Sequence, residues 1–535
     1  PVTSEIAKDT EFFLGGITVT GNTVLSEEEI RAIVEPRVGL LVDSAKLKAI
    51  TDLLTQTLKE KGYVTSICVL PAQDVVDGVV MLKIIEDRLS QIRLAGASAY
   101  QFKARVFLDQ LADLQGKVIN SPVLKKRLRY LTNLPGVRLI PKVNSLSEGN
   151  SELVLNIQPL GNLYSVSMSN GGSRFTGYER ATVSGRINNV TGSSDYLSVT
   201  MSSAAKNPKF LGSVGLNYGK PLGKNGGTLN IGADSMYYRF DPQEVGFDEV
   251  RYEGGSGSMS VGYSQPYWPD FSPNYVYRAN WSVGYEMKTN KAQTIYNVFF
   301  TAEQPAGYKY VDTSDKLSVL RVGGDVSLSR GGPRDSVVLL DVSLVQALEG
   351  FFGAMTQDDI KRKQENLSAN SEPVTGPVGN VKGMDAAFTK LYFTGRHFKP
   401  LKNGVSWDSK IGVEYSPSKK IPQSFKFGDA DGGASGYDIE TALSKSFQQK
   451  NMRGSIGYRR QTAYSWFRDI EPGCTDKDGR AQATSAGMNR CSNGRFFVRV
   501  SYDRGNVSAS LDVDSRRPRY NRDNRQGVFQ VAYRW

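Results

Sequence analysis

The stretch NYVYRANWSVGYEMK, residues 274–288, decides the fold, because its side chains alternate in character from one residue to the next. The odd-numbered positions from Tyr275 to Met287 all carry apolar or aromatic side chains. Most positions between them are polar, including Arg278 and Glu286. A period of two places the two sets on opposite faces of a β-strand. The pattern predicts a strand with one face against an apolar phase and the other in water.

The same alternation recurs along the C-terminal two-thirds of the chain. We count about sixteen such segments, each roughly ten residues long, between Asn162 and Trp535. In the last of them Phe529, Tyr533 and Trp535 lie on an apolar face that runs to the final residue. Clear examples are VSWDSKIGVEY at 405–415, NVSASLDVDS at 506–515 and GVFQVAYRW at 527–535.

Two architectures have strands in which apolar and polar side chains alternate, a soluble β-sandwich and a transmembrane barrel. A sandwich buries a mostly aliphatic face, whereas here the apolar face carries Tyr and Trp near the strand ends, as a membrane-interface girdle does. The opposite face carries paired charges, which suits a hydrated interior. Backbone groups in lipid must all be hydrogen-bonded internally, so the sheet has to close. We therefore expect residues 162–535 to form a transmembrane antiparallel β-barrel of about sixteen strands.

The N-terminal third has a different pattern, in which a β-α-α-β-β unit occurs twice. The first copy spans 12–87, with Ser26 and Glu29 as a capping box and a longer helix ended by Gly62. The second copy spans 88–161, with helices predicted at 99–114 and 121–134. Residues 1–11 form a short N-terminal segment without a signal-peptide pattern, so we expect a mature or trimmed chain.

The composition argues against catalysis. The 535 residues carry a net charge of +12, and His397 is the one histidine, which nearly excludes histidine triads and multi-histidine metal sites. The sequence has no glycine-rich phosphate loop and no zinc-ligand spacing. We therefore expect no enzymatic activity, no catalytic residues, no metal site and no cofactor. The basic residues follow no stacking pattern with aromatics on one soluble surface, so no nucleic-acid partner is expected.

Three cysteines are present. Cys474 and Cys491 flank a polar segment that we expect to be one outer loop, where an oxidising compartment would let them pair and stabilise the loop by about 3 kcal/mol. The alternative is two free thiols, and if residues 481–488 are instead a strand the sulfurs cannot meet. Cys68 lies in an apolar strand and is predicted to be a small core residue.

The chain resembles the outer-membrane transporters of two-partner secretion, the TpsB family, which belong to the superfamily of barrel-assembly insertases. Both N-terminal copies resemble POTRA domains, and the first does so most specifically, with Gly21, Asn22, Gly62 and Tyr63 in the matching positions. The resemblance covers nearly the whole chain. It is carried by ITVTGNTVLSEEEI at 17–30, LKEKGYVTSICVLPAQDVVDGVVMLKIIED at 58–87 and SNGGSRFTGYERATVSGRINNVTGSSDYLSV at 169–199.

The resemblance also implies a loop that folds back into the barrel lumen and carries an Arg-Gly-Tyr motif. The matching residues here are Ser435, Gly436 and Tyr437, so the arginine is replaced and no ion pair is expected from position 435. The related barrel-wall motif, Phe-x-Asp-x-Gly, is matched by Phe467 and Asp469, with Glu471 in place of the glycine. Asp469 is expected to pair with another base, such as Arg459 or Arg460, or to be solvated.

The terminal aromatics Phe529, Tyr533 and Trp535 resemble the sorting signal that the barrel-assembly machinery reads. The resemblance implies a location in the outer membrane of a Gram-negative bacterium, with the POTRA domains in the periplasm, and we expect a monomer. An arginine cluster is expected to face lipopolysaccharide phosphates or to be a plain solvated loop. Its members are Arg516, Arg517, Arg519, Arg522 and Arg525.

The function that the resemblance implies is export of an unfolded partner protein in two-partner, or type Vb, secretion. The partner would be an adhesin, a cytolysin or a contact-dependent toxin, captured by strand addition to a POTRA sheet edge. In the first copy, the segments 46–61 and 64–70 would frame such a groove, or would only pack the module. The alternative function is an insertase for outer-membrane proteins, against which the count of two POTRA copies argues. A passive porin would not need the two modules.

Overall fold

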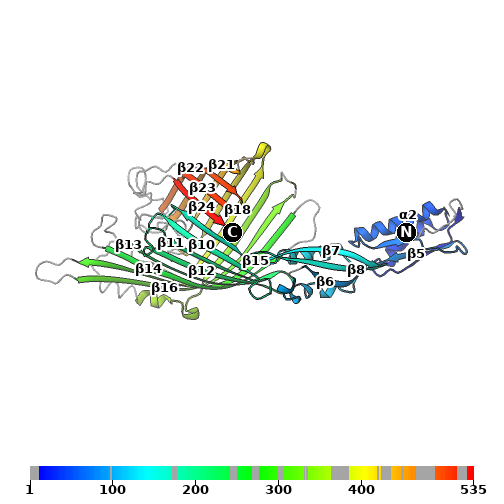
Figure 1. The fold of residues 1–535 in the computed structure, drawn as a ribbon, viewed down its shortest axis with the longest axis horizontal. Coiled ribbons are helices and arrows are strands. Elements are labelled where there is room, and N and C mark those ends of the chain that lie inside the picture. Colours follow the sequence, from blue (N-terminus) through cyan, green and yellow to red (C-terminus); the bar gives the residue numbers. More distant parts are fainter. Residues whose placement is uncertain are drawn as a thin grey trace. The chain divides into compact units, whose positions relative to one another are not determined.

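The computed structural model describes residues 11–96, 99–171, 177–240, 250–267, 276–298, 307–330, 332, 335–362, 385–418, 421–422, 435–447, 451–465, 489–514 and 527–535. The chain divides into two compact units. The first unit comprises the chain up to Leu160 together with residues 191–194 and 223–226, and the second comprises the remainder. Figure 1 shows the mixed helices and strands of the first unit and the long adjacent strands of the second.

The first module, residues 12–87, has the predicted β-α-α-β-β order. Its central strand β5 is parallel to β2 and antiparallel to β4. The predicted apolar face of α2 is confirmed, because Leu47, Ile50, Leu54 and Leu58 are all buried in one cluster with side chains of β5. The elements are β1 (Phe12–Phe13), β2 (Gly16–Thr20), α1 (Glu27–Val34), η1 (Glu35–Arg37), β3 (Leu41–Val42), α2 (Ser44–Glu60), β4 (Ile67–Val69) and β5 (Val79–Ile85).

The predicted capping box at the start of α1 is confirmed. The backbone N–H of Glu29 donates to Ser26 Oγ at 3.3 Å, and the Ser26 N–H donates to Glu29 Oε2 at 2.9 Å. Lys61, at the end of α2, lies 2.5 Å from Glu29 Oε2. This hydrogen bond from Lys61, together with the bond from the Ser26 backbone, lowers the pKa of Glu29 below its usual value. The start of α1 is thus attached to the end of α2.

The second module, residues 88–161, repeats the order around a central strand β8, which is parallel to β6 and antiparallel to β7. The predicted helix at 99–114 is broken into three short turns, because Phe102, Phe107 and Leu111 all enter the core at spacings that one straight helix does not provide. The elements are β6 (Arg88–Ala95), η2 (Ala99–Gln101), α3 (Arg105–Leu108), η3 (Ala112–Leu114), α4 (Ser121–Thr132), β7 (Val137–Ser147) and β8 (Asn150–Pro159). No described helix of the chain is long and apolar enough to cross a membrane.

Within the described residues, sixteen strands form a closed antiparallel barrel, which confirms the predicted fold (Figure 1). Each strand pairs with its sequence neighbours, and β24 returns to β9. The strands are β9 (Leu163–Ser169), β10 (Arg180–Asn188), β11 (Tyr196–Ala204), β12 (Leu211–Leu222), β13 (Gly227–Phe240), β14 (Val250–Tyr267), β15 (Val276–Val298), β16 (Gly307–Ser329), β17 (Val337–Ala347), β18 (Thr389–Pro400), β19 (Val405–Tyr415), β20 (Ser435–Phe447), β21 (Met452–Ser465), β22 (Asn489–Arg504), β23 (Val507–Asp514) and β24 (Gly527–Arg534).

The two faces of the barrel wall differ as the alternation predicts. Met259 of β14, Ile456 of β21 and Phe496 of β22 point outward and are 67%, 62% and 66% exposed. Their neighbours in sequence point inward, where Ser258 of β14 is paired opposite Lys288 of β15. A closed sheet with an exposed apolar outer belt and a polar interior is the construction of a transmembrane β-barrel.

The pairing of β24 with β9 closes the barrel. The register runs from Gln530 opposite Ser169 to Arg534 opposite Ser165. Trp535 adds two further backbone hydrogen bonds, since its N–H donates to the Tyr164 carbonyl at 3.0 Å and its carbonyl accepts from the Tyr164 N–H at 2.9 Å. The two aromatic rings lie 6.0 Å apart. The last residue therefore belongs to the closing ladder.

Connections of different length join the strands at the two ends of the barrel. Short turns at 223–226, 401–404 and 505–506 lie at the end that contains Trp535. The sequence between β17 and β18, β19 and β20, β21 and β22, and β23 and β24 is longer. The turn at 505–506 agrees with the predicted short turn at 503–506, whereas the outer loop predicted at 516–525 lies outside the described residues. The arginine cluster of that connection lies outside the described residues.

The structure confirms Cys68 as a core residue, since it is 7% exposed, and burial raises the pKa of its thiol to about 12. Only the thiolate reacts with alkylating reagents, so we expect iodoacetamide at about pH 8 to leave Cys68 unmodified in the folded protein and to modify it in urea. Peptide mass spectrometry distinguishes Cys68 from Cys474 and Cys491. Rapid modification of Cys68 in the folded protein would contradict its buried position.

Candidate functional sites on the modules and the barrel wall

Three consecutive residues, Glu86, Asp87 and Arg88, join the two modules. Thr23 donates to the Glu86 carboxylate through its backbone N–H and through its hydroxyl, whose Oγ1 lies 2.6 Å from Oε2. The Arg88 guanidinium donates to the same oxygen at 2.7 Å. The Glu86 side chain is 3% exposed, so these bonds replace the water that a buried carboxylate loses.

Asp87 is bonded to both modules. Its N–H donates to Ser66 Oγ of the first module at 3.1 Å. In the second module, Ser151 Oγ donates to its carboxylate at 2.9 Å, and the Ile119 N–H donates to its carbonyl at 2.8 Å. With its polar groups satisfied in this way, the junction is a fixed connection between the modules.

Gly62, one of the predicted motif residues, lies at the same junction. Its φ of +95° is readily adopted only by glycine, and its carbonyl accepts a hydrogen bond from the Ser121 N–H at 2.8 Å. A Cβ at this position would lie 2.7 Å from Cδ of Pro122, in the first turn of α4. The end of α2 therefore approaches the start of α4 as closely as a glycine permits.

Two other predicted motif residues, Gly21 and Asn22, form the turn after β2. Gly21 has a φ of +77°, and a Cβ there would lie 2.3 Å from the Ile84 carbonyl oxygen. The Asn22 side chain accepts from the Leu25 N–H at 2.9 Å and donates to the Leu25 carbonyl at 2.7 Å. This turn leads directly into Thr23, so it positions the residue that holds Glu86.

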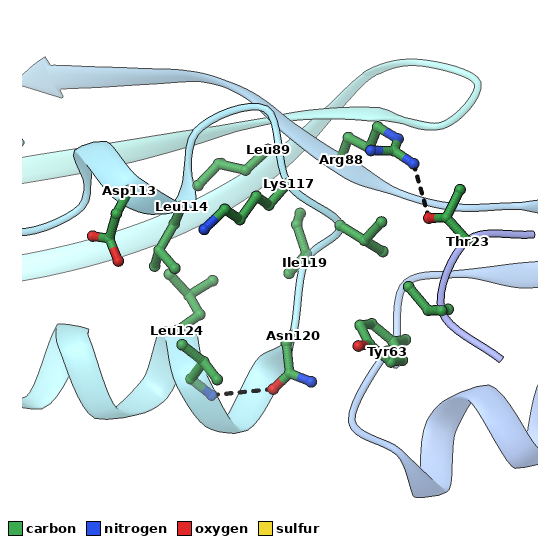
Figure 2. Close-up of a pocket in the computed structure, with 13 residues that line it drawn as sticks. Thr23, Tyr63, Arg88, Leu89, Asp113, Leu114, Lys117, Ile119, Asn120 and Leu124 are labelled. Atoms are coloured by element: carbon green, nitrogen blue, oxygen red, sulfur yellow. Dashed lines mark hydrogen bonds between the residues drawn. The ribbon is translucent and has the colours of Figure 1, made fainter. Parts of the chain in front are cut away.

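A cleft of about 510 Å³ lies between the modules (Figure 2). The fourth predicted motif residue, Tyr63, lines it together with Thr23 and Arg88 on one side. The second module contributes an apolar floor and a polar edge. These residues include Leu89, Leu114, Ile119 and Leu124 of the floor and Asp113, Lys117 and Asn120 of the edge.

The two modules carry opposite net charge. Residues 12–87 contain seven Lys and Arg against eleven Asp and Glu, a net charge of −4. Residues 88–161 contain eleven Lys and Arg against four Asp and Glu, a net charge of +7. Much of the positive charge lies on α4, at Lys125, Lys126, Arg127 and Arg129. The second module is therefore the part of this unit that favours anionic groups.

The sheet edges of the modules differ in how open they are. At the groove predicted between α2 and β4, the outward N–H of Cys68 already donates to Thr55 Oγ1 of α2 at 2.9 Å. That edge is short and partly closed. In contrast, the outer edge of β7 makes no backbone hydrogen bond to any other described segment, and it exposes Ile140, Val143 and Leu146. An open edge with apolar side chains is suited to strand addition.

A cluster of four charged side chains covers Phe497 on the inner face of the barrel. Arg459 and Arg499 donate to one oxygen of Asp512 at 3.0 and 2.7 Å. Both also approach Glu440, at 3.5 and 3.6 Å. The two guanidinium carbons lie 4.3 and 5.2 Å from the centre of the Phe497 ring, which is 1% exposed. These contacts join β20, β21, β22 and β23 across the interior.

An apolar cluster also lies on the inner face, near the end of the barrel that carries the long connections. Leu317 and Val319 of β16 lie on the same face as Arg321, which points into the barrel. On β17, Val345 and Ala347 lie on the inner face together with Ser343. Segments from two connections bury these side chains. The contributing residues are Met355, Ile360, Ala386, Phe388 and Ile421, all between 0% and 7% exposed. We name these residues the inner-wall cluster.

Lys390 lies beside the inner-wall cluster and is fully buried. Its Nζ lies 2.5 Å from Glu414 Oε2 and 4.9 Å from the centre of the Tyr392 ring. Lys390 and Tyr392 of β18 and Glu414 of β19 all lie on the inner face. A buried ammonium requires such a charged partner. The Lys390–Glu414 ion pair therefore connects β18 to β19 beside the inner-wall cluster.

The remaining predicted site residues are distributed as follows. Ser435, Gly436 and Tyr437 are the first residues of β20, where Ser435 Oγ accepts from the Ser416 N–H at 3.0 Å, so they belong to the wall rather than to a loop. Cys491 lies in β22, opposite Ala463 of β21, and not in the predicted loop, because the ladder extends to Asn489. Phe467, Asp469 and Cys474 lie outside the described residues.

Arg459 is predicted from the sequence only as one possible partner of Asp469. The structure places it against Asp512 and Glu440. Phe529, Tyr533 and Trp535 lie on the outer face of the last strand, 48%, 47% and 53% exposed. No group of histidine, cysteine and acidic residues suited to a metal ion occurs among the described residues.

Comparisons with known proteins agree with this architecture. A model of the ShlB-type POTRA domain family matches residues 12–87. The outer membrane transporter CdiB of Escherichia coli is 31% identical over 152 residues, which is 28% of this chain and 25% of that protein. The heme/hemopexin transporter protein HuxB of Haemophilus influenzae is 21% identical over 299 residues, which is 55% of this chain and 52% of that protein. The chain thus spans between a quarter and about half the length of these relatives.

Solved structures show the same fold. CdiB from Escherichia coli superimposes with a TM-score of 0.64 at 18% identity, covering 100% of this chain and 92% of that one. CdiB from Acinetobacter baumannii gives a TM-score of 0.58 at 16% identity, covering 100% and 93%. The POTRA family model thus matches the first module, and the whole chain has the fold of the CdiB structures.

We expect Gly62→Ala to loosen the junction, since it forces a strained φ and a contact with Pro122, at a cost of about 1–3 kcal/mol. Hydrogen exchange of the Ser121 and Ile119 amides, which bond across the junction, should accelerate by roughly tenfold or more. The control is Gly39→Ala, because Gly39 has a similar φ of +82° but nothing within 4 Å of an added Cβ. Equal exchange in both variants would contradict the role of Gly62.

We expect Ile360→Asp to detach its segment from the inner-wall cluster, because it buries a carboxylate with no partner among apolar side chains. The prediction is a larger and noisier single-channel conductance in planar bilayers. Lys361→Asp is the control, since Lys361 is adjacent but its side chain is 64% exposed. Unchanged conductance in an inserted Ile360→Asp barrel would show that the cluster does not narrow the pore.

Proposed function

We propose that the chain is an outer-membrane channel that exports an unfolded partner protein by two-partner secretion. The barrel lies in the outer membrane of a Gram-negative bacterium, and the modules lie in the periplasm. The partner is captured by the modules, threads through the barrel and folds outside. The absence of a visible nucleotide motif in the sequence fits an export step driven by folding on the far side.

The observation that carries this proposal is the combination of a closed barrel with a polar interior and two modules that are fixed to each other. A passive channel needs only the closed barrel with its polar interior. The modules add an open apolar strand edge at β7 and a cleft at a preorganised junction, which are features of a protein-binding surface. CdiB and HuxB, which share parts of this sequence, are both named as transporters.

We infer that strand addition uses β7 rather than the α2–β4 groove. The N–H of Cys68 at that groove is occupied by Thr55, whereas β7 has eleven residues and an open outer edge. Exposed Ile140, Val143 and Leu146 give an extended partner apolar contacts beside the new backbone hydrogen bonds.

Several features of the whole protein belong to the same proposal. Residues 88–161 act as a second POTRA domain, the chain is a monomer, and its outer end contacts lipopolysaccharide. Cys474 and Cys491 pair in the oxidising compartment. The barrel-assembly machinery recognises the C-terminal strand through Phe529, Tyr533 and Trp535, which the exposed outer-face position of these side chains supports.

The test is an export assay in which the chain is expressed with the large secreted protein encoded beside it. We expect the intact chain to release that protein into the medium. Removal of residues 12–161 should abolish release while the barrel still inserts, as shown by heat-modifiable migration in SDS gels. The proposal fails if the intact chain releases no partner protein and removal of residues 12–161 instead lowers the amount of other outer-membrane proteins. The chain would then be an insertase.

A further inference from the structure

We propose that the cleft between the two modules binds an extended, acidic segment that carries an apolar side chain, and that the exported protein supplies this segment. The inference rests on the proposed export function and specifies what part of the partner the modules recognise. It is independent of strand addition at β7.

The cleft is preorganised for a ligand. Its walls belong to different modules, but Glu86, Asp87 and Gly62 hold those modules together through the hydrogen bonds described above. The volume of about 510 Å³ lies in the usual range for a binding pocket. Binding therefore requires little ordering of the modules, which favours affinity.

The floor of the cleft selects an apolar side chain. Leu114, Val118 and Val123 are partly exposed there, above the buried Leu89, Ile119 and Leu124. Val123 alone is 43% exposed. In Figure 2 Leu89, Leu114 and Leu124 of the second module lie on one side of the view, and Tyr63 and Thr23 of the first module lie on the other. An apolar side chain inserted between them would remove this surface from water.

The charges at the edge select acidic neighbours for that side chain. Asp113 is already paired with Arg127 at 3.1 Å, and Arg88 with Glu86 at 2.7 Å. Lys117 is exposed and forms no ion pair with a described residue, and Figure 2 shows it extending over the cleft toward Leu114. Lys125 and Lys126 of α4 likewise form no ion pair with a described residue. The net charge of +7 on the second module reinforces the preference for an anion.

A peptide fits these features better than a lipid surface does. A flat anionic membrane could approach Lys125 and Lys126, but it could not reach the apolar floor between the modules. A free phosphate would use Lys117 and leave the floor exposed. In an extended chain an apolar side chain can enter the cleft while the acidic side chains next to it point away from the floor and stay near the edge that carries Lys117.

The test measures binding of fluorescent synthetic peptides to the full chain in detergent micelles, by anisotropy. One peptide of about twelve residues alternates Asp with Leu, and its counterpart alternates Lys with Leu. We expect the acidic peptide to bind at least about tenfold more tightly than the basic one, as charge complementarity at a partly enclosed site would give. Both peptides are equally apolar, so the difference reports charge.

Two variants and two matched controls locate the site. Lys117→Glu should weaken acidic-peptide binding about tenfold, whereas Lys48→Glu makes the same charge change on an exposed residue of α2 away from the cleft and should not. Val123→Trp should fill the cleft and abolish binding, whereas Val38→Trp, at a residue 41% exposed in the first module, should not. Equal effects of a variant and its control would overturn the proposal.

Two further outcomes decide against the cleft. If vesicles containing phosphatidylglycerol bind the chain with the same dependence on Lys117 and displace the peptide, the surface is a membrane site. If Lys117→Glu and Val123→Trp leave export unchanged while removal of residues 12–161 stops it, the export function stands and the cleft proposal fails. Loss of export in both cleft variants, with both controls active, supports it.

Discussion

The whole structure depends on the requirement that backbone groups in lipid find hydrogen-bond partners within the protein. That requirement forces the sheet to close, and closure fixes which face of every strand meets lipid. The alternation of side chains satisfies both conditions at once, with residues such as Met259 outward and Ser258 inward. Polar groups can then be concentrated on the inner wall without destabilising the span. The charge cluster around Phe497 and the Lys390–Glu414 pair are possible only because of this division.

The architecture was predictable because it follows from local patterns. Strand alternation, the capping box of Ser26 and Glu29, and the face of α2 each depend on residues close in sequence. Cys68 was likewise predictable as a core residue from its apolar neighbours. The exception was the helix expected at 99–114, where packing of Phe102 into the same core as Phe107 and Leu111 overrode the helical pattern.

The sites were harder to predict because they depend on register and on contacts between distant segments. The alternation places Arg499 and Asp512 on a polar face, but only the pairing of β22 with β23 sets them opposite each other. Nothing local indicates that Thr23 holds Glu86 or that Gly62 meets Pro122. The motif residues Gly21 and Gly62 were found by resemblance, and the structure supplies the physical reason for glycine at each. Ser435 lies in the wall at the first position of β20, next to the undescribed segment 423–434.

The closing ladder between β24 and β9 has a kinetic consequence. Its partners, such as Tyr164 and Trp535, are separated by nearly the whole length of the barrel sequence. Contacts with so large a sequence separation form late, because the intervening chain must lose its freedom first. Until the contacts between β24 and β9 form, the growing sheet has two unpaired edge strands that can associate with any other extended chain. The barrel thus passes through an aggregation-prone intermediate, and a catalyst that shields both margins would shorten its lifetime.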